Sequence, residues 1–208
     1  MAEVWVCAEQ FDYGKGKKRE AEHRAGIRLL RKALEGRFGL VLEDEEALSF
    51  AVGPHGKPYL KEFPEIEFNI SHCSGLAVCA VGDCPLGVDI EKERRYREAL
   101  PSQALSESEL RFLTVEEPEI LFRFWTLKES YVKAVGCGIT IPFPEISFTL
   151  EEESGKIRCS QPGFQFWQRR LFDGYVLAVC AGTEEEVKLR WKLPAELPDR
   201  ATECDCGL

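Results

Sequence analysis

The sequence predicts an α+β fold of two similar halves, each a long helix packed on a mainly antiparallel sheet. Apolar residues recur every three to four positions in two long segments, and they alternate or run continuously in several shorter ones. The string L-A-V-C-A also occurs twice, at residues 76–80 and 177–181. Each copy lies in an apolar strand that follows a helix in its own half, which favours an internal duplication.

The first half, residues 1–94, is expected to contain one helix among several strands. The helix is indicated by Ile27, Leu30 and Leu34, which recur at helical steps before Gly39, a residue that can end it. The expected elements are a strand at 4–7, a helix at 20–38, and strands at 66–71, 76–81 and 85–91.

The second half, residues 95–208, is expected to begin with charged helices and to end in strands. Residues 92–121 are predicted to be mostly helical, with a capping box at Ser106 and Glu109. A strongly apolar helix follows and stops near Gly136. The expected elements are a helix at 120–135, strands at 146–150, 156–159, 175–181 and 187–193, and a polar tail from about residue 194.

The charge of the chain is uneven. Its 208 residues carry 36 acidic and 27 basic side chains, a net charge of −9, and 44% of them are hydrophobic. This composition excludes a disordered chain and argues against nucleic acid or an anionic membrane as partner. Residues 14–37, however, hold nine basic and three acidic side chains, which is a local net charge of +6. That segment is either a site for one compact anion or a solvated helix face.

The cysteines indicate a reducing compartment. There are nine, an odd number, and none forms a C-x-x-C pair. Cys204 and Cys206 form a C-x-C near the end, which is either a metal-binding pair or two thiols on an exposed tail. The sequence has no secretory signal pattern and no apolar stretch of about 20 residues, so we expect a cytoplasmic protein.

The strand G-V-D-I-E at residues 87–91 is the first candidate for chemistry. Asp89 and Glu91 are two apart and therefore share one face of a strand, while Val88 and Ile90 share the other. Two neighbouring carboxylates repel each other unless a cation lies between them, and Mg²⁺ prefers such oxygens. The alternative is an edge strand with a solvated acidic face.

Two further segments carry polar side chains in otherwise apolar surroundings. In the expected helix at 120–135, Trp125, Glu129 and Lys133 are four apart and line one face, either as a ligand site or as a solvated Glu–Lys ion pair. The third candidate is F-N-I-S-H at 68–72, which follows G-K-P at 56–58. Its histidine and the upstream lysine are donors that suit a phosphate, although a lone histidine at a strand end is usually a surface group.

Together these motifs resemble those of the Sfp-type 4′-phosphopantetheinyl transferases. That family carries G-[VI]-D-[IV]-E, then [WF]-x-x-K-E-[SA]-x-x-K some forty residues on, and both are intact here. The G-K-P and F-N-x-S-H segments match as well, so the resemblance spans roughly residues 20–145. It implies a monomer with two pseudo-twofold-related halves and a ligand in the cleft between them.

The resemblance implies a reaction and a role for each matched residue. The phosphopantetheine arm of coenzyme A would pass to a serine of an apo acyl or peptidyl carrier protein, releasing 3′,5′-ADP. The implied metal ligands for Mg²⁺, or Mn²⁺, are Asp89, Glu91 and Glu129. Glu129 is also the implied base, directly or through a water, and Lys133 with Lys128 would stabilise charge on the phosphoryl oxygens. The side chains implied to bind coenzyme A phosphates are those of Arg24, Lys57, Ser71, His72 and Lys133.

Some assignments stay open in this interpretation. Arg19 or Arg28 would replace Arg24 at the 3′-phosphate if the alignment slips. Fatty-acid, polyketide and peptide-synthetase carriers fit equally well. The expected carrier surface, for which a solvated helix is the alternative, consists of Lys92, Arg94, Arg95, Arg97, Leu110, Phe112 and Leu113.

Three rival functions remain to be tested. One is a homologue that binds coenzyme A or a carrier without transfer, although such a protein has no need of a full set of carboxylates and lysines. Another is a metal-dependent phosphohydrolase, in which water replaces the serine. The third is a nucleic-acid module built on residues 14–37, which lacks a stacking motif and is opposed by a net charge of −15 elsewhere.

Overall fold

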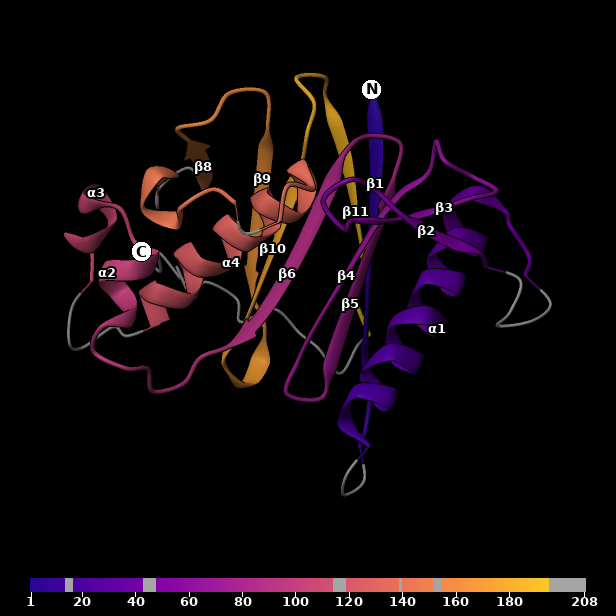
Figure 1. Cartoon of the computed structure of the whole chain (residues 1–208), viewed down its shortest axis with the longest axis horizontal. Coiled ribbons are helices and arrows are strands. Elements are labelled where there is room, and N and C mark those ends of the chain that lie inside the picture. The colour runs from indigo at the N-terminus through magenta and orange to yellow at the C-terminus, as the bar shows by residue number, and fades with distance from the viewer. Residues whose placement is uncertain (14–16, 43–47, 114–118, 139, 152–154, 195–208) are drawn as a thin grey trace, which may run out of the picture.

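Two helices flank two β-sheets in the computed structural model (Figure 1), which describes residues 1–13, 17–42, 48–113, 119–138, 140–151 and 155–194. The longer helices are α1 (Lys18–Phe38) and α4 (Glu119–Val135). Helix α1 ends where the backbone of Gly39 turns left-handed with φ 69°. The predicted α+β fold with one long helix in each half is confirmed, and both helices lie within two residues of their predicted bounds.

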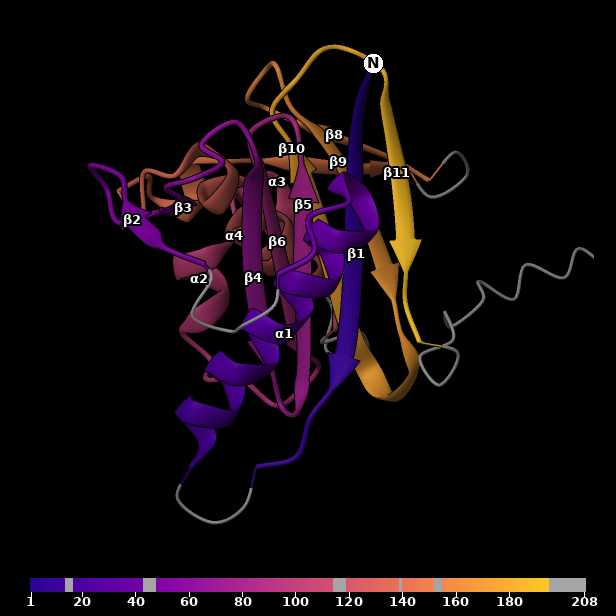
Figure 2. The ribbon, with the colours of Figure 1, turned by 90° about the vertical axis from the view of Figure 1, so that its right-hand side faces the viewer.

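The first sheet has four strands in the order β11-β1-β5-β4. Strand β1 pairs antiparallel with β5 and parallel with β11, and β5 pairs antiparallel with β4. In Figure 2, where this sheet lies behind α1, β11 runs beside β1 on its right. The strands are β1 (Ala2–Gln10), β4 (Glu67–Cys73), β5 (Leu76–Gly82) and β11 (Val187–Lys192).

The second sheet has three antiparallel strands in the order β6-β10-β9. They are β6 (Leu86–Lys92), β9 (Gln165–Arg170) and β10 (Tyr175–Ala181). Two small ribbons complete the β structure: β2 (Phe50–Val52) with β3 (Pro58–Leu60), and β7 (Phe148–Glu151) with β8 (Lys156–Cys159).

The two halves repeat one topology. In the first, β1, α1, a ribbon, β4 and β5 give the strand order β1-β5-β4; in the second, β6, α4, a ribbon, β9 and β10 give β6-β10-β9. The two L-A-V-C-A strings form β5 and β10, the central strands at equivalent positions. Strand β6 therefore lies with the second sheet, so this topology divides the chain near residues 83–85 and not at residue 94, as the sequence suggested.

The inner faces of both sheets share one apolar core, and each helix covers an outer face. The shared core contains Val4, Val6, Val78, Val88, Ile90, Leu177 and Val179. Helix α1 packs Leu29, Leu30 and Leu34 on the first sheet, and α4 packs Leu127 and Tyr131 on the second. Strands β4 and β6, the edges of the two sheets, run next to each other between the helices (Figure 1).

Three regions differ from the sequence-based expectation, and the first is the ribbon of β2 and β3, which was not predicted. Of residues 92–121, which were expected to be mostly helical, residues 93–113 form only the short helices α2 (Leu100–Ala104) and α3 (Glu107–Leu110), and residues 119–121 begin α4. The chain before α2 is irregular. The predicted capping box of Ser106 and Glu109 is present at the start of α3. Strand β9 was not predicted, because only Phe166 of its six residues is buried and the apolar alternation is therefore weak.

Gly87 sets the distance between β6 and α4. A Cβ atom at this position would lie 2.0 Å from the carbonyl oxygen of Ser130 and 2.5 Å from the amide nitrogen of Ala134. Both are helix backbone atoms and cannot rotate away, so only glycine allows this approach. The glycine of the G-V-D-I-E motif thus lets the helix with Glu129 and Lys133 pack directly on the strand with Asp89.

We predict that Gly87→Ala lowers the free energy of unfolding by about 1–3 kcal/mol, because α4 must move off β6. The transfer activity that the resemblance implies should fall at least tenfold, since the groups on helix and strand separate. Gly53→Ala is the matched control, because a Cβ there would lie 3.5 Å from the nearest atom, an ordinary contact. Urea unfolding and initial rates on both variants test this; wild-type behaviour of Gly87→Ala would contradict it.

Candidate active site between β6 and α4

The carboxylates of β6 face helix α4. Val88 and Ile90 point into the core between the sheets, which leaves Asp89 and Glu91 on the opposite face of the strand, as predicted. Asp89 is 5% exposed and Glu91 is half-buried. The alternative of an edge strand with a solvated acidic face is therefore wrong, because α4 covers this face of the strand.

Asp89 is anchored through one of its two carboxylate oxygens. Ser71 on β4 donates its hydroxyl proton to Oδ1 at 2.9 Å, and Lys133 on α4 donates to the same oxygen at 2.5 Å. The other oxygen, Oδ2, is buried without a hydrogen-bond partner. A buried carboxylate oxygen with no donor is costly unless a cation or another donor reaches it.

Glu129 brings a third carboxylate to this face. Burial raises the pKa of its carboxyl group above the ordinary value, and the charges of Asp89 and Glu91 add to the rise while Lys133 opposes it. The ammonium group of Lys133 is bonded to Asp89 and not held in the alternative Glu129–Lys133 surface pair. The cluster therefore concentrates negative charge that a cation would relieve.

The raised pKa of Glu129 predicts a pH-dependent stability of the metal-free protein. Folding favours the protonated form, so its contribution is complete below the unfolded pKa and is lost as pH rises through the folded value. In urea unfolding with a chelator present, Glu129→Gln should therefore gain stability relative to wild type between pH 4.5 and 7.5. A difference between the two proteins that stays constant over this range would contradict the raised pKa.

The three carboxylates fit a hard divalent cation by their chemistry. Oxygen ligands, like charges and the partnerless Oδ2 of Asp89 all favour one. No three side chains of the ligand-forming types converge closely enough to hold an ion as they stand, within the described part of the chain. Instead the ammonium of Lys133 lies on Asp89, and Glu91 bonds the guanidinium of Arg94 at 2.6 Å.

Lys128 does not reach this cluster, which corrects its expected role at the phosphoryl oxygens. Its side chain is fully buried and donates to Glu109 at 2.5 Å and to the carbonyl oxygens of Ala104 and Phe143. Burial lowers the pKa of this lysine, although Glu109 opposes the shift. Three acceptors account for all three protons of an ammonium group, so Lys128 joins α4 to the segments around α2, α3 and residue 143.

Ser71 and Lys57 are also held by protein groups and not free for a ligand. The hydroxyl of Ser71 bonds Asp89, as described above. The ammonium of Lys57 donates to Glu67 at 2.8 Å and to the carbonyl oxygens of Leu86 and Ala134. Leu86 is three residues from Asp89, roughly 10 Å along β6, so the structure does not bring Lys57 to the carboxylates.

His72 meets helix α1 through a glutamate. Its Nδ1 lies 3.4 Å from Oε1 of Glu22, and the ammonium of Lys18 lies 3.6 Å from the same oxygen. Arg24 is two residues beyond Glu22, about 200° around the helix, and it pairs with Glu20. The structure therefore brings Lys18, and not Arg24, to His72.

Much of the basic segment is neutralised by the protein itself. Arg28 and Lys32 bind Glu9 on β1, and Arg37 binds Glu3 and Asp83. Lys15 lies outside the described residues, as do Cys204 and Cys206. The alternative of a helix face with ordinary surface pairs thus holds for most of α1.

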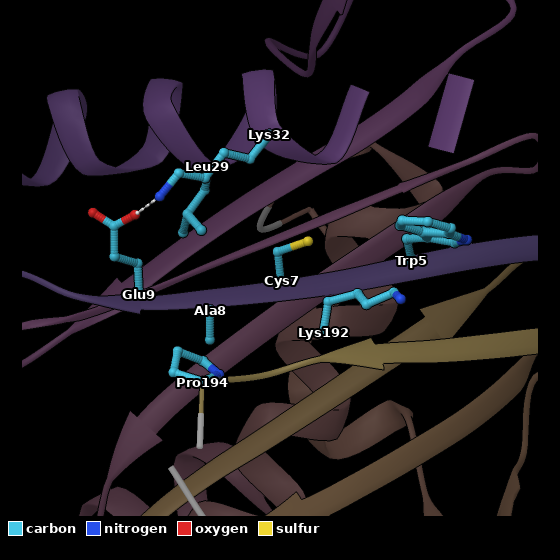
Figure 3. Close-up of a pocket in the computed structure, with 8 residues that line it drawn as sticks. All are labelled: Trp5, Cys7, Ala8, Glu9, Leu29, Lys32, Lys192 and Pro194. Carbon is cyan, nitrogen blue, oxygen red and sulfur yellow. Dashed lines mark hydrogen bonds and ion pairs between the residues drawn. The ribbon is translucent and has the colours of Figure 1, made fainter. Parts of the chain in front are cut away.

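A groove of about 380 Å³ lies elsewhere, between α1 and β11 (Figure 3). Its floor is β1, with Trp5, Cys7 and Glu9, and its walls include Lys32 and Lys192. Two strands, β5 and β4, separate β1 from the edge where β6 lies. This groove is therefore not part of the carboxylate cluster.

Known proteins are similar to this chain in sequence. The model of the family described as the 4′-phosphopantetheinyl transferase superfamily matches residues 85–180, which span β6 to β10. A 4′-phosphopantetheinyl transferase of Bacillus subtilis is 34% identical over 173 residues, covering 78% of this chain and 75% of that protein. The chain belongs to the 4′-phosphopantetheinyl transferase family. The predicted family and enzyme class are thereby confirmed.

Two further relatives are also similar in sequence to this transferase. The 4′-phosphopantetheinyl transferase Sfp of Bacillus subtilis strain 168 is 28% identical over the same shares of both chains. The 4′-phosphopantetheinyl transferase HetI of a Nostoc species is 36% identical over 57% of this chain and 54% of that protein. None of the helices described for the transferase is long and apolar enough to cross a membrane.

The sequence did not reveal the roles of three residues that contact the predicted site residues. Glu22 joins Lys18 and His72, Glu109 neutralises Lys128, and Asn69 bonds the backbone of β6. A buried polar residue in an apolar strand was the available signal for Asn69. Lys18 is one helical turn from Glu22, but His72 and Lys128 lie far along the chain from Glu22 and Glu109, so spacing gave no signal for these two contacts.

Proposed function

We propose that this chain transfers the 4′-phosphopantetheine arm of coenzyme A to a serine of an apo acyl or peptidyl carrier protein, releasing 3′,5′-ADP. The observation that carries the proposal is the set of Asp89, Glu91, Glu129 and Lys133, gathered where β6 packs on α4. A site for pyrophosphate and one cation needs these groups. Family membership supports the reaction, and the partnerless Oδ2 of Asp89 supports the cation.

Asp89, Glu91 and Glu129 are the proposed ligands of Mg²⁺, with Mn²⁺ as the alternative. When bound there, the cation neutralises charge on the pyrophosphate. Glu129 accepts the proton of the carrier serine, directly or through a water, and burial makes this carboxylate a stronger base than an exposed one.

The ammonium group of Lys133 donates to Ser71, Asp89 and the carbonyl oxygen of Val88. Unlike Lys57 and Lys128, it lies at the carboxylates themselves, and its proposed role is to turn to the phosphoryl oxygens and stabilise the negative charge that grows there.

The apo carrier is proposed to bind at α3 and at the connection between β6 and α2. Phe112 is 53% exposed and Leu110 is 37% exposed, and both follow the start of α3. Arg95 and Arg97 lie on the exposed connection between β6 and α2. These apolar and basic groups suit the acidic face of a carrier helix. Charge reversal at Arg95 and Arg97 should raise KM for the carrier and leave KM for coenzyme A unchanged.

The compartment and assembly are proposed as well. All seven cysteines that the structure describes are free thiols, which supports a reducing cytoplasm. Both halves of the repeat lie in one chain, which supports a monomer.

Measuring the mass of an apo carrier after incubation with the protein, coenzyme A and Mg²⁺ tests the function. Transfer adds one phosphopantetheine to the carrier. Tight binding of coenzyme A with no adduct on fatty-acid, polyketide and peptide-synthetase carriers would favour the non-catalytic homologue. Release of free phosphopantetheine without carrier modification would favour the phosphohydrolase.

His72 and Lys18 both contact Glu22, and we propose that the 3′-phosphate binds beside them. We expect His72→Ala and Lys18→Ala each to raise KM for coenzyme A about tenfold, the effect of losing one charged hydrogen bond. With 3′-dephospho-coenzyme A as substrate, both variants should behave like wild type. Arg24→Ala is the matched control on the far side of α1, and a selective rise of KM in that variant instead would overturn the assignment.

A further inference from the structure

The two sheets meet at β4 and β6 without a backbone ladder between them. Strand β4 makes its ladder with β5, and β6 makes its ladder with β10. Alternate amide groups of an edge strand point away from its only ladder and need other acceptors. On β6 these are the amides of Val88 and Ile90, which flank Asp89.

Two side chains of β4 supply the acceptors. Oδ1 of Asn69 accepts from the amide of Val88 at 2.9 Å, and Oγ of Ser71 accepts from the amide of Ile90 at 3.4 Å. Both side chains belong to residues that are only 8% exposed. The two-residue spacing of Asn69 and Ser71 matches that of Val88 and Ile90. We call these two contacts the polar seam.

The polar seam also fixes the orientation of the Asp89 carboxylate. Ser71 donates its one hydroxyl proton to Oδ1 of Asp89 and lies 3.1 Å from the ammonium of Lys133, a second donor to its oxygen. With Oδ1 held by Ser71 and Lys133, the partnerless Oδ2 is the oxygen left for a ligand. The hydroxyl of Ser71 therefore has no proton left to donate to a phosphate.

We propose that Asn69 and Ser71 are positioning residues, which hold β6 against β4 so that Asp89 presents Oδ2 to a cation. The proposal rests on the proposed function, because the cation belongs to that reaction. It replaces the phosphate-binding role expected of Ser71, and it gives Asn69 a role in transfer that its sequence context did not indicate.

Three measurements on Ser71→Ala and Asn69→Ala test this proposal. Amide hydrogen exchange at Val88 and Ile90 reports the seam, Mn²⁺ titration followed by electron paramagnetic resonance reports the cation, and steady-state kinetics separate kcat from KM. Ser71→Thr keeps the hydroxyl and tests rescue. Ser130→Ala is the matched control, because that buried hydroxyl donates only to Leu127 of its own helix.

We expect Ile90 in Ser71→Ala and Val88 in Asn69→Ala to exchange at least tenfold faster than in wild type. The Kd for Mn²⁺ should rise about 10- to 100-fold, as it does when residues that orient a metal ligand are removed. The kcat should fall by a similar factor, with KM for coenzyme A changed less than threefold. Ser71→Thr should restore both, and Ser130→Ala should match wild type.

Several results would overturn the proposal. Unchanged exchange would show that the seam is absent, and faster exchange with normal Mn²⁺ affinity and kcat would show that it positions nothing. A rise in KM for coenzyme A alone would return Ser71 to the phosphates. If Asn69→Ala does not fold, Ser71→Ala decides the test alone. Like the control Ser130→Ala, it removes only one buried hydroxyl group. Failure of wild type to bind Mn²⁺ and to transfer would refute the proposed function, while exchange would still report the seam.

Discussion

Glu129→Gln is expected to lower kcat for transfer roughly 100- to 10,000-fold, the usual contribution of a general base. Glutamine keeps the shape of the side chain but has no carboxylate to accept a proton. The stability of the metal-free variant at neutral pH should equal or exceed that of wild type, because a buried charge near Asp89 and Glu91 is removed. A variant that loses activity but gains stability would show that the carboxylate of Glu129 serves the reaction and not the fold.

Intact-mass assays and thermal unfolding on the same preparation test both halves of this expectation. Glu151→Gln serves as control, since this glutamate lies on β7 and pairs with Arg158. Transfer by Glu129→Gln within threefold of the wild-type rate would remove Glu129 from the role of base. Loss of stability together with activity would show that its carboxylate holds the fold.

Lys128→Met is expected to lower the free energy of unfolding by about 3–5 kcal/mol, because it leaves Glu109 charged and buried without its partner. The carbonyl oxygens of Ala104 and Phe143 lose a donor at the same time. Once the folded fraction is taken into account, kcat should stay within a few-fold of wild type. Chemical denaturation with activity measured on the same samples separates these two effects.

The double variant Lys128→Met/Glu109→Gln provides the internal comparison. It removes both charges and should lose less stability than Lys128→Met alone. Lys192→Met, on the exposed side of β11, should lose almost nothing. A large fall in kcat with full stability in Lys128→Met would restore the catalytic role that the sequence motif implied.

The site was largely predictable wherever a local rule decides which way a residue points. The alternation of a strand placed Asp89 and Glu91 together, and the four-residue helical step placed Glu129 and Lys133 together. What joins the two pairs is the contact of β6 with α4, and Gly87 was its sequence signal. Its meaning becomes clear only when the helix that it contacts is known.

The remaining assignments depended on contacts between segments far apart in the chain. Lys128 and Lys133 are both lysines of one helix motif, yet five residues correspond to about 140° around the helix axis. One therefore reaches Asp89 while the other reaches Glu109. In the same way, the register of β4 against β6 decides that Ser71 meets a carboxylate, and neither motif by itself contains that register.

The number of Mn²⁺ ions bound per chain, measured by electron paramagnetic resonance, tests the central claim most directly. The claim is that Asp89, Glu91 and Glu129 form the cation site of the transferase. Wild type should bind one ion, and Asp89→Asn should bind it at least tenfold more weakly. The control Asp173→Asn, which removes an exposed carboxylate bonded to Lys92, should bind as wild type does. Wild-type stoichiometry and affinity in Asp89→Asn would contradict the account.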